Sequence, residues 1–187
     1  ALLAESLKAV HGLETLSLSI DDFYLTHLER RVLANTSHPL FVTRGVPGTH
    51  DIPLLESTLE RLFEASSKDQ TAIPRFNKAS DDRMQPADWC RYEGKPDVVI
   101  LEGWCVGSRA QPDTLLETPI NRLEAEEDPE GQWRLSVNEA LKGDYRTLYS
   151  KLDRLVLLNI PDFSVVKAWR SLQEQKLKDS LQDPLNS

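Results

Sequence analysis

The sequence predicts an α/β fold with a largely parallel sheet, and three observations along its 187 residues support this. Val98–Leu101 is a short, mostly β-branched apolar run between Pro96-Asp97 and Gly103, which is typical of a strand buried on both faces of a parallel sheet. A buried helix turn is the alternative, but the run is short and rich in Val and Ile. Two more apolar segments, 16–20 and 155–160, have the length of strands. Segments with helical spacing alternate with these strands, as they do in α/β folds.

The chain is acidic and has the composition of a globular protein. Its formal net charge is −8, with 40% hydrophobic and 28% charged residues. This charge argues against a broad nucleic-acid surface, although local basic groups could still bind a small anion. No apolar run approaches the roughly 20 residues that a membrane span needs. Cys90 and Cys105 are too few for a disulfide framework and indicate a reducing compartment, so we expect a cytoplasmic protein.

Five segments have the apolar spacing of helices, and several have capping residues. Thr26 and Asp51 precede two of them and Asp162 precedes the last, each with a side chain that can accept from the first free backbone N–H groups. Gly143 weakens the fourth segment by about 1 kcal/mol. The predicted helices are 1–10, 26–34, 52–63, 133–152 and 163–177.

The connecting segments are predicted from their polarity. We expect 71–76 to be extended, 77–94 to be a polar loop and 105–119 to be a loop. The strongly acidic segment 122–131 is interpreted as a solvated surface.

Two of the predicted strands end in carboxylates. Asp21 and Asp22 follow the strand at 16–20, and Glu102 follows the strand at 98–101. If the two strands are neighbours, these groups converge at the sheet edge where ligands of open α/β folds bind. Converging carboxylates can hold a divalent cation or take a proton from a substrate hydroxyl. The alternative is that Asp21 or Asp22 only caps the following segment.

Residues 44–51 combine a guanidinium, two glycines and an imidazole just before a helix N-terminus. Arg44 and the backbone N–H groups there could bind a carboxylate or a phosphate. The alternatives are an ordinary glycine turn with a solvated Arg44 and a structural, hydrogen-bonding role for His50.

Other basic residues are weaker candidates. Arg75 and Lys78 could add positive charge to the same edge or form a solvated basic pair. Arg170 could bind a phosphate or pair with Glu174 four residues later on its helix.

Two patterns of common active sites are missing from the sequence. Cys90 and Cys105 have no zinc spacing and no accompanying Cys-His constellation, so neither is predicted to be a nucleophile or a metal ligand. None of the eight glycines begins a Gly-x-x-x-x-Gly-Lys-Ser/Thr loop, the phosphate cradle of most NTPases.

Taken together, the motifs resemble the D-glycerate 3-kinase family, within the P-loop kinases of the phosphoribulokinase, uridine kinase and pantothenate kinase group. Each motif alone is weak, but the combination is specific. The resemblance runs from near residue 1 to residue 177, and its matching segments are 19–24, 44–51, 74–78, 101–104, 137–141 and 169–174.

The resemblance implies a P-loop NTPase-like, three-layer α/β/α fold with a mainly parallel sheet and a helical lid. In that family the glycine-rich phosphate loop precedes the first helix, whereas this sequence opens inside that helix without a cap. The resemblance therefore implies that 1–187 is a single domain truncated at the N-terminus and at the C-terminus.

The resemblance also implies roles for individual residues. Asp21 matches the carboxylate that accepts the proton of the attacking hydroxyl, and Glu102 matches the acidic residue near Mg²⁺. Arg170 matches the lid arginine that contacts the phosphates of ATP and the transferred phosphoryl group. The acceptor would be bound by Tyr24, Arg44, Thr49, His50 and Lys78, although Asn77 stands where an Asp is expected.

The implied function is ATP-dependent phosphoryl transfer to a hydroxyl of a small hydroxy acid, most of all D-glycerate, with ATP and Mg²⁺ as cofactors. No nucleic-acid or membrane partner is expected. The alternatives are a related kinase acting on pantothenate or a nucleoside, and a non-catalytic binding protein that kept the P-loop-like fold.

Overall fold

A computed structural model describes residues 2–159, 162 and 164–182 of the chain. By its internal contacts the chain divides into two compact units, Ala1–Leu152 and Asp153–Ser187. All of the strands described below belong to the first unit, and the second contains one long helix.

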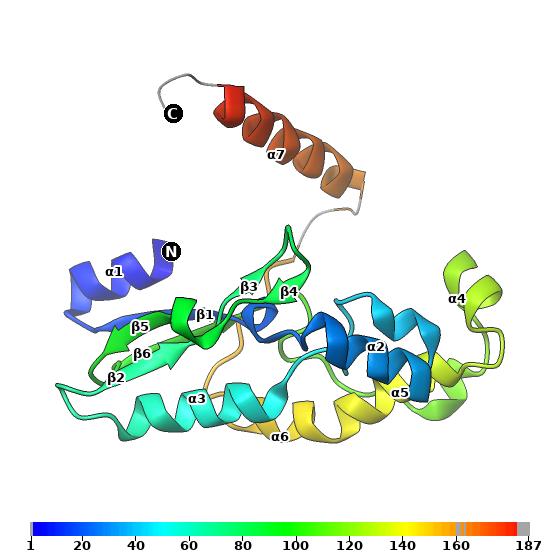
Figure 1. The fold of residues 1–187 in the computed structure, drawn as a ribbon, viewed down its shortest axis with the longest axis horizontal. Helices are drawn as coiled ribbons and strands as arrows, with labels where there is room; N and C mark the ends of the chain where they lie inside the picture. Colours follow the sequence, from blue (N-terminus) through cyan, green and yellow to red (C-terminus); the bar gives the residue numbers. More distant parts are fainter. Residues whose placement is uncertain (1, 160–161, 163, 183–187) are drawn as a thin grey trace. The chain divides into compact units, whose positions relative to one another are not determined.

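The elements of the first unit follow the predicted alternation of helices and strands (Figure 1). The helices are α1 (Leu2–His11), α2 (His27–Thr36), α3 (Ile52–Glu64), α4 (Arg122–Glu127), α5 (Gln132–Lys142) and α6 (Asp144–Ser150). The strands are β1 (Thr15–Ser19), β2 (Gln70–Ile73), β3 (Phe76–Asn77), β4 (Asp82–Arg83), β5 (Cys90–Glu93) and β6 (Val98–Glu102). Short 3₁₀ turns are Ile20–Phe23, Pro39–Val42, Pro86–Asp88 and Asp113–Leu116.

The parallel pair β1–β6 contains the two strands that the sequence predicted with acidic ends. The register runs from Thr15 opposite Val98 to Ser19 opposite Glu102. β2–β5 and β3–β4 are antiparallel pairs. The expectation that residues 98–101 are buried on both faces was wrong, because their side chains are only half-buried. Within the described chain β6 pairs with β1 alone, so one edge of the strand carries no neighbour.

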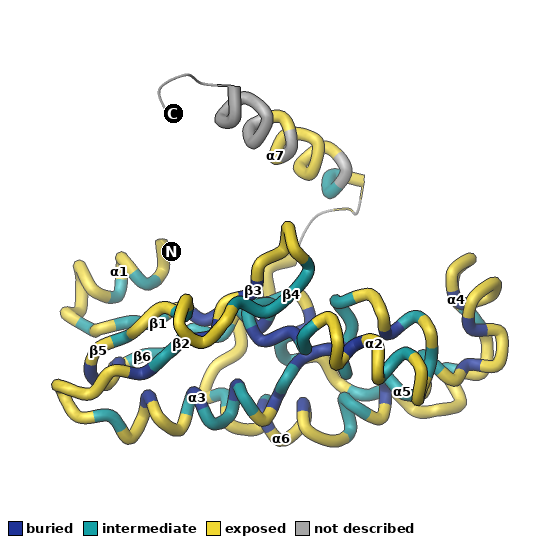
Figure 2. Tube along the Cα trace, viewed as in Figure 1, coloured by how far each residue is buried: buried dark blue, intermediate teal, exposed yellow. Residues whose placement is uncertain are grey.

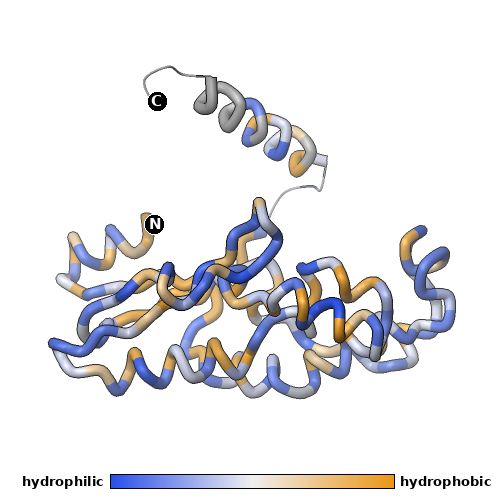
Figure 3. The backbone as a smooth tube through the Cα atoms, viewed as in Figure 1, coloured by the Kyte–Doolittle hydropathy of each residue, from blue (hydrophilic) through white to orange (hydrophobic). Residues whose placement is uncertain are grey.

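The strands of the first unit lie between helices. Figure 1 shows α1 on one side of β1 and β6, and α3 and α6 on the other. The main core forms where the turn after β1 meets α3 and α6, and Figure 2 shows buried residues along this line. Figure 3 shows apolar residues gathered along β1 and β6. The core residues are Ile20, Phe23, Ile52, Leu55, Cys105, Tyr145 and Leu148.

Two helices, α2 and α3, begin at the capping residues that the sequence predicted. Thr26 accepts from the backbone N–H of Glu29, whose side chain in turn accepts from the backbone N–H of Thr26, so α2 begins with a capping box. Asp51 accepts from the backbone N–H of Leu54 at the start of α3. These caps are local, which is why sequence spacing was sufficient to find them.

Two segment predictions were wrong in the first unit. The polar loop expected at 77–94 contains β4 and β5. The side chains of β4 are half-buried, those of β5 are mostly exposed, and neither strand has an apolar alternation. The single helix expected at 133–152 is two helices, since α5 ends at Lys142, α6 begins at Asp144 and Gly143 separates them. Gly143 is not helical in its backbone torsions (φ −93°, ψ −114°).

The acidic segment 122–131 is not simply a solvated surface. It contains α4, and the side chains of Glu124 and Asp128 are buried. Asp128 pairs with the guanidinium of buried Arg134 at 3.2 Å, and Glu124 accepts from the backbone N–H of Ile120. These partners satisfy both carboxylates, which makes their burial tolerable.

The strand expected at 155–160 is not formed over its described part. Residues 155–159 have no regular structure, and Ile160 lies outside the described residues. Leu157 and Leu158 are 83% and 87% exposed. A strand exists only by pairing with another, and in the described chain these residues have no strand partner.

The second unit contains α7 (Ser164–Gln182). The predicted capping residue Asp162 accepts from the backbone N–H of Ser164 at 2.7 Å, as expected for the start of this helix. Phe163, where the prediction began the helix, lies outside the described residues. Within the described residues, no helix is both long and apolar enough to cross a membrane.

Tyr24, His50 and Tyr145 form an aromatic stack beside the main core. The rings of Tyr24 and His50 are stacked with centroids 4.4 Å apart, and Tyr145 meets His50 edge-on at 5.8 Å. Burial lowers the pKa of His50 from its ordinary 6.5 to about 4, while the negative charge of Asp21 partly opposes this shift. His50 is therefore neutral at physiological pH.

We predict that Gly103→Ala destabilises the first unit. A Cβ at position 103 would lie 2.3 Å from Cγ2 of Ile20, a fully buried core residue. Relieving this overlap should lower the free energy of unfolding by about 1–3 kcal/mol, measured by urea denaturation. Gly45→Ala is the matched control, because Gly45 also has a positive φ but a Cβ there would meet nothing within 4 Å. Equal losses in the two variants would contradict the steric explanation.

We also predict that His50 makes stability fall in acid. Its pKa is about 4 in the folded chain and 6.5 ordinarily, so the unfolded chain binds the proton more readily. Its contribution is complete above pH 6.5 and is lost as the pH falls toward 4, by up to about 3 kcal/mol. Urea unfolding between pH 4 and 7.5 should show a shallower loss in His50→Gln. His11→Gln, on an exposed helix end, should follow the unmodified protein, and parallel curves for all three would refute the prediction.

Candidate functional site

The acidic end of β1 places Asp21 on a short 3₁₀ turn, where its side chain is partly exposed. Its Oδ1 accepts from the hydroxyl of Tyr24 at 3.1 Å, and its Oδ2 accepts from Nζ of Lys78 at 2.7 Å. Burial raises the pKa of Tyr24, and the nearby Asp21 carboxylate raises it further, so the phenol stays protonated and donates. The carboxylate is therefore oriented from two sides, as a general base requires.

Asp22 has a different environment from Asp21. Its Oδ2 accepts from the Arg75 guanidinium at 2.9 Å, and its Oδ1 accepts from the backbone N–H of Phe76 at 3.2 Å. These bonds tie the turn after β1 to β3. Asp22 and Arg75 thus form a pair that holds structure, whereas the side-chain partners of Asp21 in the described chain are the buried Tyr24 and the exposed Lys78.

The loop 44–51 is closed by its own threonine. The Thr49 hydroxyl donates to the Val46 carbonyl at 2.7 Å and accepts from the Gly45 backbone N–H at 3.1 Å. Thr49 is fully buried. Its hydroxyl is therefore already engaged within the loop, and the indole N–H of Trp104 donates to the Gly45 carbonyl at 2.9 Å from outside.

Backbone hydrogen bonds attach this loop to the turn after β1. The Leu25 N–H donates to the Thr49 carbonyl at 2.9 Å, and the Asp51 N–H donates to the Phe23 carbonyl at 2.7 Å. Tyr24 and His50 face each other in this antiparallel bridge. The bridge brings the basic loop beside Asp21, so Asp21, Tyr24, His50 and Lys78 meet in one place.

Arg44 reaches the same region and lies over the ring of Phe76, 5.4 Å from its centroid. Its guanidinium pairs with Oδ1 of Asp81, while Oδ2 of Asp81 accepts from Arg30 at 2.9 Å. Partial burial acts to raise the pKa of Asp81, but the hydrogen bonds from Arg30 and Arg44 outweigh it and hold that pKa below its ordinary value. Arg44 is thus near the site but already holds a carboxylate.

Glu102 ends β6 and is exposed, opposite Ser19 in the parallel register. This places it at the same sheet edge as Asp21, as predicted. The described residues contain no group of three or more His, Cys, Asp or Glu side chains arranged for a metal ion. Mg²⁺ needs only one or two protein carboxylates when substrate phosphates and water supply the other ligands, so Glu102 fits that donor set.

Arg170 lies on α7, in the second unit, and its guanidinium donates to Gln173 at 3.2 Å. The side chain of Glu174, the other predicted partner, lies outside the described residues. The predicted phosphate-binding role of Arg170 stays a prediction.

Several residues at the site were not predicted. Arg30 is fully buried and donates to the carbonyls of Leu25 and Val42 as well as to Asp81. Tyr145 contacts His50 from α6, 95 residues away in sequence. An Arg on a polar helix and a Tyr on an apolar face carry no local signal of such contacts, so sequence spacing could not reveal them.

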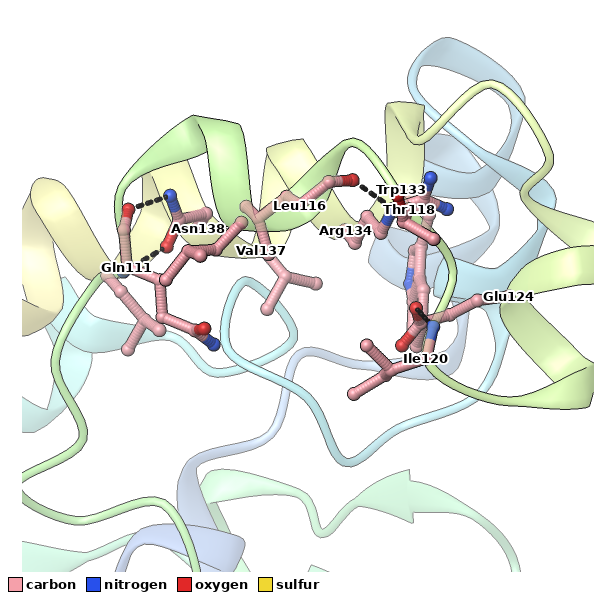
Figure 4. A pocket seen from close by; sticks show the side chains of 11 residues that line it. Gln111, Leu116, Thr118, Ile120, Glu124, Trp133, Arg134, Val137 and Asn138 are labelled. Carbon is pink, nitrogen blue, oxygen red and sulfur yellow. Dashed lines mark hydrogen bonds between the residues drawn. The ribbon is translucent and has the colours of Figure 1, made fainter.

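A separate cavity of about 210 Å³ lies between the segment 111–124 and α5 (Figure 4). Asn138 closes one end through bonds to both backbone groups of Gln111, and the Trp133 indole stands at the other. None of the residues predicted to carry chemistry lines this cavity. The candidate site is therefore the sheet edge around Asp21 rather than this cavity.

Comparison with known proteins gives relatives that are kinases. No family model matches the chain. It is 36% identical over 167 residues to the uncharacterized kinase mug58 of Schizosaccharomyces pombe, covering 86% of this chain and 59% of that one. It is 30% identical over 161 residues to the chloroplastic D-glycerate 3-kinase of Arabidopsis thaliana, covering 82% of this chain and 33% of that one. The chain thus spans about three-fifths and one-third of these relatives.

A solved structure agrees with these relatives. The D-glycerate 3-kinase from Cryptococcus neoformans superimposes with a TM-score of 0.77 at 31% identity, over 96% of this chain and 65% of that chain. The three-layer P-loop kinase fold expected from the sequence is thereby confirmed. The relatives and the solved structure that this chain resembles are thus D-glycerate 3-kinases and related uncharacterized kinases.

Proposed function

We propose that the protein is an ATP-dependent kinase that phosphorylates a hydroxyl of a small hydroxy acid, with D-glycerate as the first candidate. The observation that carries the proposal is the Asp21 carboxylate, held at the end of β1 between Tyr24 and Lys78 in a chain whose relatives are kinases. Two of those relatives are described as D-glycerate 3-kinases, which supports that acceptor.

Asp21 is the proposed general base. Its partly exposed carboxylate accepts the proton of the attacking hydroxyl while Tyr24 keeps one of its oxygens in place. Lys78 then exchanges part of its contact with Asp21 for the substrate. The pair is open to this exchange because the Lys78 side chain is 62% exposed, and exposed ion pairs are worth at most about 1 kcal/mol.

Arg44, His50 and Lys78 are the proposed binding groups for the acid end of the acceptor. They are basic or hydrogen-bonding side chains gathered at one edge of a protein with a net charge of −8. A carboxylate on the acceptor gives these groups a partner that a neutral sugar or nucleoside lacks. Tyr24 and Thr49 shape the same site, the former against His50 and the latter by closing the loop.

The nucleotide side of the reaction rests on Glu102 and Arg170. Mg²⁺ and ATP supply charge neutralisation and the phosphoryl group when bound. Glu102 is the proposed protein ligand of the metal, and Arg170 is the proposed contact to the phosphates. Since most of the catalysis of phosphoryl transfer is positioning, orienting the acceptor at Asp21 is the main task of the residues in the first unit.

The direct test of this proposal is ATP consumption with a panel of acceptors. The chain, and any longer form that its gene encodes, would be assayed with Mg²⁺ and D-glycerate, pantothenate or uridine. Phosphorylation of D-glycerate by either form supports the proposal. Transfer to pantothenate or uridine alone would replace the acceptor, and binding of acceptors without transfer by any form would favour a non-catalytic protein.

We predict that Asp21→Asn lowers turnover by roughly 10²–10⁴-fold while leaving ATP affinity unchanged, because it removes the proton acceptor but keeps the shape of the side chain. Turnover with D-glycerate and ATP binding by calorimetry check this, in whichever form of the protein is active. Asp22→Asn is the control, since Asp22 bonds to Arg75 and Phe76 and should lower stability more than turnover per folded molecule. Unchanged turnover in Asp21→Asn would remove the residue from this role.

A further inference from the structure

The two ring nitrogens of His50 have unequal surroundings. Nδ1 lies 2.6 Å from the hydroxyl oxygen of Tyr145. Nε2 is buried and has no hydrogen-bond partner among the residues that the structure describes. The side chain as a whole is buried, with 5% of its surface exposed. An imidazole with one satisfied and one unsatisfied nitrogen needs an explanation, because buried polar groups are normally paired.

The hydrogen bonds around Tyr145 determine which nitrogen of His50 carries the proton. The Tyr145 oxygen accepts from the backbone N–H of Gly48 at 3.0 Å. Its own single proton needs an acceptor, and backbone N–H groups can only donate. Within the described part of the chain, Nδ1 of His50 at 2.6 Å is the acceptor beside this buried hydroxyl. The Tyr145 hydroxyl therefore donates to Nδ1. A neutral imidazole with an accepting Nδ1 carries its proton on Nε2.

The ring stays neutral near pH 7. Burial lowers the pKa of His50 to about 4, against the opposing charge of Asp21. The other titratable groups in ring contact with it are Tyr24 and Tyr145, and burial raises the pKa of both phenols, so both remain protonated. His50 thus presents one N–H at Nε2 and does not compete with Arg44 or Lys78 as a cation.

We propose that Tyr145 is a positioning residue that holds His50 in its Nε2–H tautomer, so that Nε2–H donates to an oxygen of the acceptor substrate. This inference rests on the proposed function and adds a residue and a hydrogen-bond polarity to its site. Nε2 is shielded from solvent here, so the bond forms when the substrate replaces side-chain atoms that now cover it. The bond then satisfies a buried donor that otherwise has no partner among the described residues.

The polarity has a consequence for substrate choice. An acceptor that places a carboxylate or hydroxyl oxygen at Nε2–H completes the hydrogen bond. A molecule that places an N–H or ammonium group there meets a second donor, and both groups lose their water without gaining a bond. The substrate class at this position is therefore an oxygen acid or polyol, as in a hydroxy acid.

The first experiment measures the tautomer directly. The chain would be labelled with ¹⁵N-histidine, and long-range ¹H–¹⁵N spectra at pH 7 would assign each ring, with His50→Gln identifying the signal among the four histidines. We expect His50 to show an unprotonated Nδ1 and a protonated Nε2. The opposite tautomer, or a charged ring, would overturn the inference whatever the protein does, and this result needs no variant at Tyr145 to fold.

The second experiment compares Tyr145→Phe with Tyr149→Phe. The control removes the same hydroxyl from the neighbouring tyrosine. Among the residues that the structure describes, this hydroxyl donates to the Cys105 carbonyl at 3.0 Å and has no hydrogen bond to His50. Tyr145→Phe should give a mixed His50 tautomer, and Tyr149→Phe should keep the single one. An unchanged tautomer in a folded Tyr145→Phe would refute the positioning role.

The third experiment tests the contact with substrate. D-glycerate added to the unmodified protein should shift the Nε2–H signal of His50, and Tyr145→Phe should need about tenfold more D-glycerate for half-maximal shift or activity, with a smaller change in kcat. D-glycerate that binds without moving the Nε2–H signal would overturn the substrate contact. The expected tautomer in a protein that neither binds nor phosphorylates D-glycerate would contradict the proposed function instead, and would leave the Tyr145–His50 bond supported.

Discussion

The parallel pairing of β1 with β6 determines where the candidate groups lie. Its register ends with Ser19 opposite Glu102. The turn that carries Asp21 therefore begins at the same edge of the sheet at which β6 ends with Glu102. A slip of one residue would exchange the faces of the strand and expose Leu18, which is buried in the contact with α3 and β2. The hydrophobic face therefore fixes the register, and the register fixes which acidic residues meet.

Two arginines share one carboxylate at the candidate site. Asp81 has two guanidinium partners, Arg44 on one oxygen and Arg30 on the other. Arg30 is fully buried and also donates to two carbonyls, so it cannot leave without isolating a charge. If Arg44 turned toward an incoming carboxylate, Asp81 would keep its bond to Arg30.

The extent to which sequence predicts this structure depends on how local each interaction is. The caps at Thr26 and Asp51, and strands β1 and β6, follow from short spacings and were predicted from them. The strand β5 was missed because its own side chains are largely polar and exposed. Its pairing with β2 is made by backbone hydrogen bonds, which the sequence does not display. No window of sequence contains both strands, so the pairing carries no local signal.

The sequence also failed to predict which charged residues are buried. The cause is the same, because the composition of a segment does not show which partners its charged side chains meet. Glu124 and Asp128 lie in an acidic segment whose composition is that of a solvated surface. Buried Asp128 is stabilised by its ion pair with Arg134. Buried Arg30 is stabilised by its ion pair with Asp81, which lies 51 residues away in the sequence. The structure brings Asp21, Tyr24, His50 and Lys78 together, and only the fold shows that Tyr145 joins them.

The candidate acceptor-binding groups are all in the first unit, and the contacts described between them lie within that unit. Asp21 and Lys78 are 57 residues apart in sequence and bond directly, and His50 joins them through its bridge with Tyr24. Arg170, the candidate for the transferred phosphoryl group, belongs to the second unit. Under the proposed function, binding of the hydroxy acid therefore depends on residues of the first unit. Acceptor binding and turnover for this reason test different residues of the proposal.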